Sequence, residues 1–405
     1  MTLSQRLKET LVCLGIFALS FFILARGAEK APFHVDEDNW VHYAVYFKVF
    51  FMDRNADPKI WDGLASKDQP PVGKYLNGLA LWLHGYRDGD FLRLDRTGPY
   101  DFSKTYEWNL EKGLAIDPKT LLICRRAAAF FAALACAFLY GAASLFFGRT
   151  TALLASLLLL INPLVLFYGR HAMTDTPLLC FMTLNLWLTG LFSGPASEGK
   201  WQKALGIAAV LGIGIGLAAG TKLNGVLSGI IFAAWCLVLW AYQRKPVYLA
   251  APIFAAGIAI FLFISINPFF YREPINKIRQ MTAFRSELSK IYQIEQPHLA
   301  LDNIAGKAQK VFERTLMPGE KNYTSISSRV RIPLDVALFL LGVLTLILRT
   351  VKDLARNKNL SPAGLTLLYA LILFAGTVAW IPMDWGRYFL PLVPPVVMFS
   401  ALGVD

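Results

Sequence analysis

Apolar residues run in long blocks along this chain, and polar residues are concentrated in a few segments between them. Most blocks are about 17 to 25 residues long, the length that a helix needs to cross the hydrocarbon core of a bilayer. They cover residues 11–25, 122–147, 151–168, 174–193, 204–220, 224–242, 247–267, 333–349, 362–382 and 387–403. The pattern therefore predicts an all-α polytopic membrane protein with ten transmembrane helices.

The first apolar block, 11–25, has two interpretations. Arg6 and Lys8 precede it, and the run Ala25-Arg26-Gly27-Ala28 weakly resembles a signal-peptide cleavage site. We favour an uncleaved helix. In both cases the preceding cations keep the N-terminus inside, so that residue 26 onward emerges outside.

Residues 26–120 form a long polar segment in which two stretches have helical periodicity. The first runs from Asp36 to Met52, and the second begins after Pro70 and Pro71. Their recurring apolar positions are Trp40, Ala44, Phe47 and Phe51 in the first, and Val72, Leu76, Leu79, Ala80 and Leu83 in the second. We expect both helices to lie in the membrane plane, and 86–117 to be an ordered loop.

The composition agrees with a membrane protein. Of the 405 residues, 55% are hydrophobic and only 17% are charged, and the mean hydropathy is +0.45. We expect one transmembrane domain over 1–405, with two large external loops at 26–120 and 268–332. The net charge of +12 lies largely in short loops, where it meets anionic lipid, so no nucleic-acid partner is expected.

The distribution of cations orients the helices. Short loops rich in Lys and Arg are placed inside by the positive-inside rule. These loops contain Arg149, Lys200, Lys203, Arg244, Lys245, Arg349, Lys352, Arg356 and Lys358. The segments 26–120, 168–175, 220–224, 268–332 and 382–387 are then external.

Two other patterns predict packing and no chemistry. The five cysteines lie in or beside apolar blocks without CxxC spacing, so neither a disulfide framework nor a zinc ribbon is indicated. The glycines between Gly206 and Gly220 have small-xxx-small spacings, which are typical of close helix packing.

Charged residues fall at every external turn of this apolar bundle. They are Asp36, Glu37, Asp38, Asp68, Lys74, Arg170, Asp175, Lys222, Asp384 and Arg387. Each has an ordinary explanation: the acids form a solvated loop or cap a helix, and the cations snorkel to headgroups. Because ionisable groups beside an apolar bundle are costly, their convergence favours a functional site.

These residues also carry a resemblance. An Asp36-Glu37 pair follows the first helix, the element Pro70-Pro71-Val72-Gly73-Lys74 comes later in the same loop, and Arg170 precedes Asp175 in the turn after the third helix. This arrangement resembles GT-C glycosyltransferases, in the branch that contains protein O-mannosyltransferases and aminoarabinose transferases. Gln69 departs from the pattern, since relatives often have a basic residue or His there.

The resemblance implies an inverting glycosyltransferase that moves a hexose or pentose from a polyprenyl-phosphate donor to a protein, lipid or glycan acceptor. Catalysis is expected from Asp36 and Glu37, with Asp36 as the base and Asp38 as its alternative. Substrate binding is expected from Asp68, Lys74, Arg170, Lys222 and Arg387. Whether the enzyme uses a divalent metal ion is left open, and Asp175 is the candidate ligand for such an ion.

Other classes stay open at this point. A transporter or lipid flippase would use the glycine-rich helix, although the sequence has no evident inverted repeat. A membrane scaffold would leave the external charges unexplained. For the glycosyltransferase, the resemblance and the charge asymmetry together imply a bacterial inner membrane location with the active site facing the periplasm. The sugar, the acceptor and the oligomeric state do not follow from the sequence.

Overall fold

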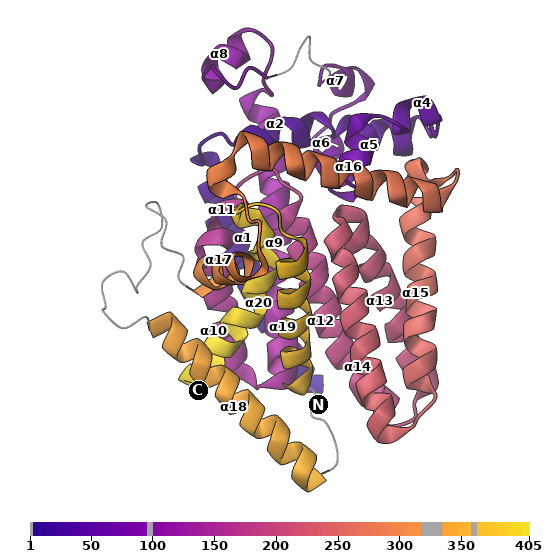
Figure 1. Ribbon diagram of the computed structural model, residues 1–405, viewed down its shortest axis with the longest axis vertical. Helices are drawn as coiled ribbons and strands as arrows, with labels where there is room; N and C mark the ends of the chain where they lie inside the picture. Colours follow the sequence, from indigo (N-terminus) through magenta and orange to yellow (C-terminus); the bar gives the residue numbers. More distant parts are fainter. Residues whose placement is uncertain (1–2, 95–99, 317–333, 358–362) are drawn as a thin grey trace.

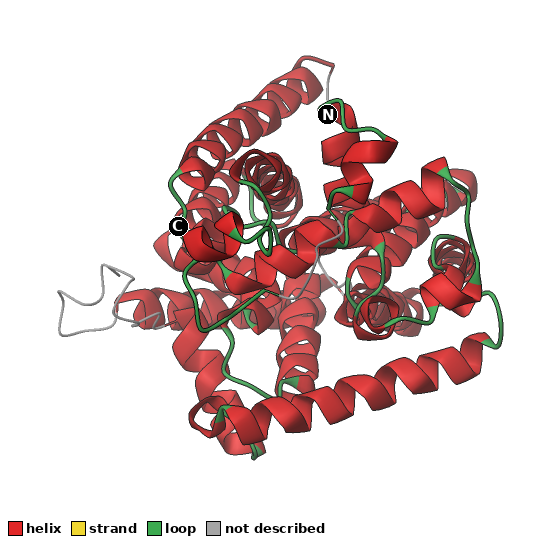
Figure 2. Cartoon of the chain, turned by 90° about the horizontal axis from the view of Figure 1, so that it is seen from above, coloured by secondary structure: helices red, strands yellow, loops and turns green. Residues whose placement is uncertain are grey.

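The computed structural model describes residues 3–94, 100–316, 334–357 and 363–405, and within these ranges it contains helices and no strand (Figure 2). Residues 95–99 of the first predicted external loop and 317–332 of the second lie outside the described residues. The α-helices are α1 (Leu3–Glu29), α2 (Val35–His42), α3 (Val45–Phe47), α4 (Pro58–Trp61), α5 (Leu64–Asp68), α6 (Val72–Leu83), α7 (Asp88–Leu92), α8 (Tyr106–Glu111), α9 (Pro118–Phe146), α10 (Arg149–Ile161), α11 (Pro163–Tyr168), α12 (Asp175–Ser197), α13 (Trp201–Thr221), α14 (Leu227–Gln243), α15 (Val247–Ser265), α16 (Pro274–Glu295), α17 (Ile304–Leu316), α18 (Leu334–Asn357), α19 (Ala363–Trp380) and α20 (Val393–Val404).

The long helices stand side by side, and the polar segments gather at one end of the bundle (Figure 1). Helices α2 and α4 to α8 lie at this end, which we call the outer end, and α16 runs across it. Both termini lie toward the opposite end. The structure therefore brings the external segments of the predicted topology together.

Eight helical segments are long and apolar enough to cross a membrane. They confirm a multi-pass membrane protein and eight of the ten predicted crossings. The segments are Leu7–Glu29, Pro118–Phe146, Asp175–Ser197, Trp201–Thr221, Leu223–Gln243, Val247–Ser265, Ala363–Trp380 and Gly386–Val404.

The predicted single helix over 151–168 is wrong. The chain breaks between α10 and α11 at Asn162, whose backbone is extended and whose side chain accepts a hydrogen bond from the N–H of Leu164 at 3.0 Å. Pro163 causes the break, because it lacks an N–H and disfavours helical backbone in the residue before it.

The apolar block 333–349, which was predicted as a transmembrane helix, also differs from that prediction. It belongs to α18, a 24-residue helix that is not among the eight apolar segments. Glycines fix its packing on α20: a Cβ on Gly342 would lie 1.8 Å from the carbonyl oxygen of Phe399, and one on Gly403 would lie 2.1 Å from that of Leu338. Only glycine permits backbones to approach this closely.

The glycine-rich run packs helices, as predicted. A Cβ on Gly212 of α13 would lie 2.6 Å from the carbonyl oxygen of Ala255 on α15, and Gly216 faces Ala259 in the same way at 3.0 Å. Small residues therefore set the spacing of α13 and α15.

The two predicted membrane-plane helices are only partly regular. The first is divided into α2, α3 and a π-helical turn over Lys48–Met52. In α6 the positions Leu79 and Leu83 are exposed, while the opposite face is buried. Gly73 lets α6 rest on the turn before α12, since a Cβ there would lie 2.1 Å from Cγ2 of Thr174.

Candidate functional site

Three cavities follow one another along α16. The first is an apolar groove of about 620 Å³ between α13, α14, α15, α19 and the start of α16, where Ile278 and Thr282 line it. The second, of about 190 Å³, lies beside Arg285 and Leu288, and we call it the basic cavity. The third, of about 840 Å³, lies beside Glu295, and we call it the outer cavity. The cavities thus progress from apolar to polar along one helix.

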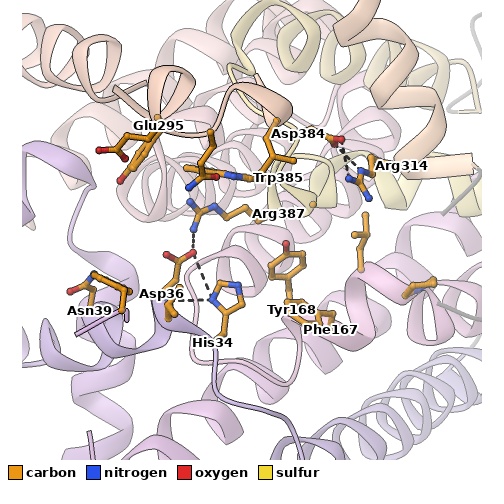
Figure 3. A pocket seen from close by; sticks show the side chains of 18 residues that line it. His34, Asp36, Asn39, Phe167, Tyr168, Glu295, Arg314, Asp384, Trp385 and Arg387 are labelled. Carbon is orange, nitrogen blue, oxygen red and sulfur yellow. Dashed lines mark hydrogen bonds and ion pairs between the residues drawn. The ribbon is translucent and has the colours of Figure 1, made fainter. Parts of the chain in front are cut away.

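Asp36 lies where the basic and outer cavities meet. It lines both, together with Asn39, Tyr292, Trp385 and Arg387. Its carboxylate accepts a hydrogen bond from Nη1 of Arg387 (Figure 3), and its side chain remains 32% exposed. The predicted base and one predicted cation are therefore brought together from positions 351 residues apart in the chain.

His34 holds the backbone of Asp36. It is the N-cap of α2, and its Nδ1 accepts a hydrogen bond from the Asp36 N–H at 3.2 Å. Burial lowers the pKa of His34, which favours the neutral ring with Nδ1 as acceptor. No role was predicted for His34, because histidine is not among the residue types preferred at N-caps.

Glu37, which was predicted as a catalytic residue, lines none of the three cavities. Its side chain is fully buried. Its Oε1 accepts from Nε of Arg125 at 2.8 Å and from the Ala172 N–H at 2.8 Å, and its Oε2 accepts from Nη2 of Arg125 at 2.6 Å and from the His34 N–H at 3.0 Å. A carboxylate held by four donors away from the cavities is suited to anchoring α2 on α9.

Asp38, the alternative base, is also buried, with 1% exposure, and it lines none of the three cavities. The helical twist of α2 explains the difference, because successive side chains point about 100° apart. Of the three consecutive acids, Asp36 alone faces the cavities.

The basic cavity contains three cations, each beside its own carboxylate. Nζ of Lys222 donates to Oδ1 of Asp175 at 2.6 Å, and Arg285 donates to Asp68. The third pair is Arg387 with Asp36. Burial lowers the pKa of Lys222, and the neighbouring Asp175 opposes this effect. Lys222, Asp68 and Arg387 were predicted as binding residues, and all three line this cavity.

Arg285 was missed by the sequence analysis. It lies on α16, a 22-residue helix within the segment that was treated as a large external loop. The signal was a helical pattern in a polar segment with Pro274 at its first turn. Its position opposite Asp68 depends on the path of α16 across the bundle.

Lys74, which was predicted to bind substrate, lines none of the three cavities. It is buried, and its Nζ donates to the carbonyl oxygens of Ala65 at 2.6 Å and Gln69 at 2.8 Å. The same nitrogen lies 5.6 Å and 5.4 Å from the ring centroids of Tyr43 and Tyr46. Lys74 therefore closes the loop between α5 and α6.

The burial of Lys74 predicts a pH dependence of stability. Burial lowers its pKa to about 7, while Asp68 acts in the opposite direction, and the unfolded side chain titrates near ~10.4. Between these values the unfolded chain binds more protons, so the free energy of unfolding should rise with pH, by at most about 1.4 kcal/mol per pH unit. Below pH 7 the cost of burying the charge is fully present.

Thermal unfolding of the purified protein between pH 7 and 10 measures this slope. Lys74→Met should reduce it, whereas Lys59→Met, at an exposed position of α4, should leave it unchanged. The same slope in the Lys74 variant and the unsubstituted protein would contradict the assignment.

Arg170 is likewise not brought into the site. Its side chain packs on α1, where a Cβ on Gly27 would lie 2.1 Å from its Nε. It lines none of the three cavities, unlike Asp68, Lys222 and Arg387, which were predicted with it as substrate-binding residues.

The carboxylates do not fit a divalent metal. Among the described residues no three His, Cys, Asp or Glu side chains form a group that could hold one. Asp36, Asp68 and Asp175 each pair with a different cation. We therefore route no chemical step through a metal.

Comparisons with known proteins agree with the fold. The model of the family described as dolichyl-phosphate-mannose-protein mannosyltransferase matches residues 64–279, more than half of the chain. No curated protein matches at a significant level.

Among solved structures, ArnT from Cupriavidus metallidurans bound to undecaprenyl phosphate is similar, with a TM-score of 0.51 and 16% identity over 100% of this chain and 61% of that one. The chain thus spans about three fifths of the length of ArnT. The Archaeoglobus fulgidus oligosaccharyltransferase has a TM-score of 0.48 at 14% identity, covering 97% of this chain and 49% of that one.

The apolar helix bundle, the polar helices across its outer end and the match over 64–279 lead to one assignment. This chain belongs to the dolichyl-phosphate-mannose-protein mannosyltransferase family and has the GT-C fold of membrane glycosyltransferases.

Proposed function

We propose that this protein transfers a sugar from a polyprenyl-phosphate donor to an acceptor hydroxyl at the outer end of the bundle, on the extracytoplasmic side of the membrane, with inversion at the anomeric carbon. The observation that carries the proposal is the position of Asp36. Its carboxylate lies between a cavity with three cations and a larger cavity that has room for an acceptor.

The apolar groove suits the lipid part of such a donor. Its wall is almost entirely apolar and includes Leu223, the residue directly after Lys222 of the basic cavity. A polyprenyl chain lying in the groove would place its phosphate among Lys222, Arg285 and Arg387. The ArnT structure, which has the same fold, is bound to undecaprenyl phosphate.

The three cations suit the leaving group. When the bond between the anomeric carbon and the phosphate oxygen breaks, the electron pair stays on the lipid phosphate and increases its negative charge. Cations that are fixed before the reaction stabilise this charge without reorganisation. A polyprenyl phosphate is a stable anion, so no general acid is required at the leaving group.

Asp36 suits the role of general base. The acceptor oxygen attacks the anomeric carbon from the face opposite the phosphate, and its proton passes to the Asp36 carboxylate. A single displacement has no covalent intermediate and therefore inverts the configuration. The outer cavity, at about 840 Å³, is within the range of ligand sites, and an acceptor bound in it would lie beside this carboxylate.

The purified protein, in vesicles without a membrane gradient, tests the activity. A radiolabelled polyprenyl-phosphate sugar should be consumed, and NMR of the product should show the inverted anomeric configuration. Retention would overturn the single displacement. The same vesicles with an imposed gradient test the alternative. Gradient-dependent movement of a solute, without donor consumption, would identify a transporter. Mass spectrometry of lipids and glycans from cells with and without the protein would identify the acceptor.

The orientation can be tested separately. Ser103 and Ser197 are exposed on opposite sides of the predicted topology, Ser103 in the first external loop and Ser197 at the end of α12. A membrane-impermeant thiol reagent should label Ser103→Cys in intact cells and Ser197→Cys only after permeabilisation, because the cation-rich loops stay inside. The reverse pattern would place the site on the cytoplasmic face.

A further inference from the structure

The turn between α19 and α20 contains Arg387. Backbone hydrogen bonds attach this turn to the segment between α16 and α17. The Leu301 N–H donates to the carbonyl oxygen of Pro382 at 3.0 Å, and the Asp384 N–H donates to that of Leu299 at 2.8 Å. These bonds surround an isolated antiparallel bridge between Ala300 and Met383. The turn is thus fixed along its backbone as far as Asp384.

One side-chain pair completes this attachment. Arg314 of α17 donates from Nε to Oδ1 of Asp384 at 2.8 Å and from Nη2 to Oδ2 at 2.9 Å (Figure 3). Asp384 is buried, and Nζ of Lys310 lies 3.7 Å from its Oδ2. The planar fork of an arginine fixes the direction of a carboxylate as well as its charge.

Directly after Asp384 begins a cluster of aromatic rings, which we call the aromatic platform. It consists of Trp385, Tyr388 and, from α16, Tyr292. The ring of Trp385 lies 5.0 Å from that of Tyr292 on α16 and 5.7 Å from that of Tyr388. The guanidinium carbon of Arg387 lies 4.5 Å from the Trp385 ring centroid. From this platform Arg387 reaches Asp36 and the basic cavity. The position of Arg387 therefore depends on where Asp384 places Trp385.

We propose that the Arg314–Asp384 ion pair is a positioning pair that holds Trp385 and Arg387 in the geometry required to bind the donor phosphate. The inference rests on the proposed function, in which Arg387 contacts that phosphate. Arg314 and Asp384 line the outer cavity and not the basic cavity, so their effect on the donor phosphate is expected to pass through the turn that carries Arg387.

Binding of undecaprenyl phosphate to the purified full chain in detergent tests this role. Arg314→Gln and Asp384→Asn should each weaken binding about 10-fold or more, because one lost charge-assisted contact of Arg387 is worth about that factor. Arg314→Lys keeps the charge without the fork and should be intermediate. The matched control is Lys307→Gln, which removes a positive charge from the same helix and should bind like the unsubstituted chain.

A double-mutant cycle distinguishes positioning from general support of the fold. In an Arg387→Ala background, Asp384→Asn should weaken binding no further, because the residue through which it acts is already gone. Equal losses in both backgrounds, or unchanged binding in Arg314→Lys and Asp384→Asn proteins that melt normally, would overturn the proposal. If the unsubstituted chain fails to bind the lipid phosphate, the proposed donor is wrong, and the positioning role falls with it.

Discussion

Asp36→Asn should lower the rate of sugar transfer by about 10²–10⁴-fold, the usual loss when a general base is removed. Asparagine is nearly isosteric with aspartate, but its amide does not accept the hydroxyl proton at neutral pH. The variant should still fold, because His34 contacts the backbone N–H of residue 36. It should also bind the donor lipid at least as well, because Arg387 loses its carboxylate partner. Single-turnover transfer and equilibrium binding of undecaprenyl phosphate measure the two effects.

The neighbouring acids provide the controls for Asp36. Asp38→Asn should have a milder effect on transfer, since Asp38 lies outside the cavities. Glu37→Gln should mainly lower stability, by about 3–5 kcal/mol, because it leaves the buried Arg125 without its counter-charge. Turnover near the unsubstituted level in well-expressed Asp36→Asn protein would reject Asp36 as the base and direct attention to Asp68 and Asp175.

Arg387→Ala should have the second large effect, a loss of about 10²–10³-fold in transfer, as when one donor that stabilises a developing negative charge is removed. Much of the loss should appear in the KM for the donor, since the phosphate is present before the reaction as well. Arg387→Lys should recover only part of it, because an ammonium group lacks the planar fork and the stacking on Trp385 at 4.5 Å.

Donor kinetics of Arg387→Ala, Arg387→Lys and Arg170→Ala provide the measurement. Arg170 is the matched control, because it is an arginine of an outer turn that packs on Gly27 and lines no cavity. If Arg387→Ala and Arg170→Ala had equal donor kinetics, Arg387 would be an ordinary membrane-interface arginine.

The membrane architecture could be predicted from sequence because its cause is local. A backbone in hydrocarbon must satisfy its own hydrogen bonds, so each long apolar block becomes a helix wherever it packs. The break at Asn162 was missed although its signal, Pro163, is also local. The path of α16 was missed for a different reason. The direction of this polar helix depends on the surface that it crosses, and that surface is formed by residues far away in the sequence.

The sequence by itself determined an apolar multi-pass bundle, a set of charges at its outer turns and the resemblance to GT-C enzymes. It could not separate Asp36 from Glu37, or Lys222 and Arg387 from Lys74 and Arg170, because these residues share their types and external positions. Only the tertiary structure distinguished the charged residues that line the cavities from those that do not. It surrounded Glu37 with four donors, buried Lys74 against carbonyl oxygens and left Asp36 at the junction of two cavities. The physical reason is that the environment of a charge depends on groups far away in the chain, such as Arg125 for Glu37 and Arg387 for Asp36.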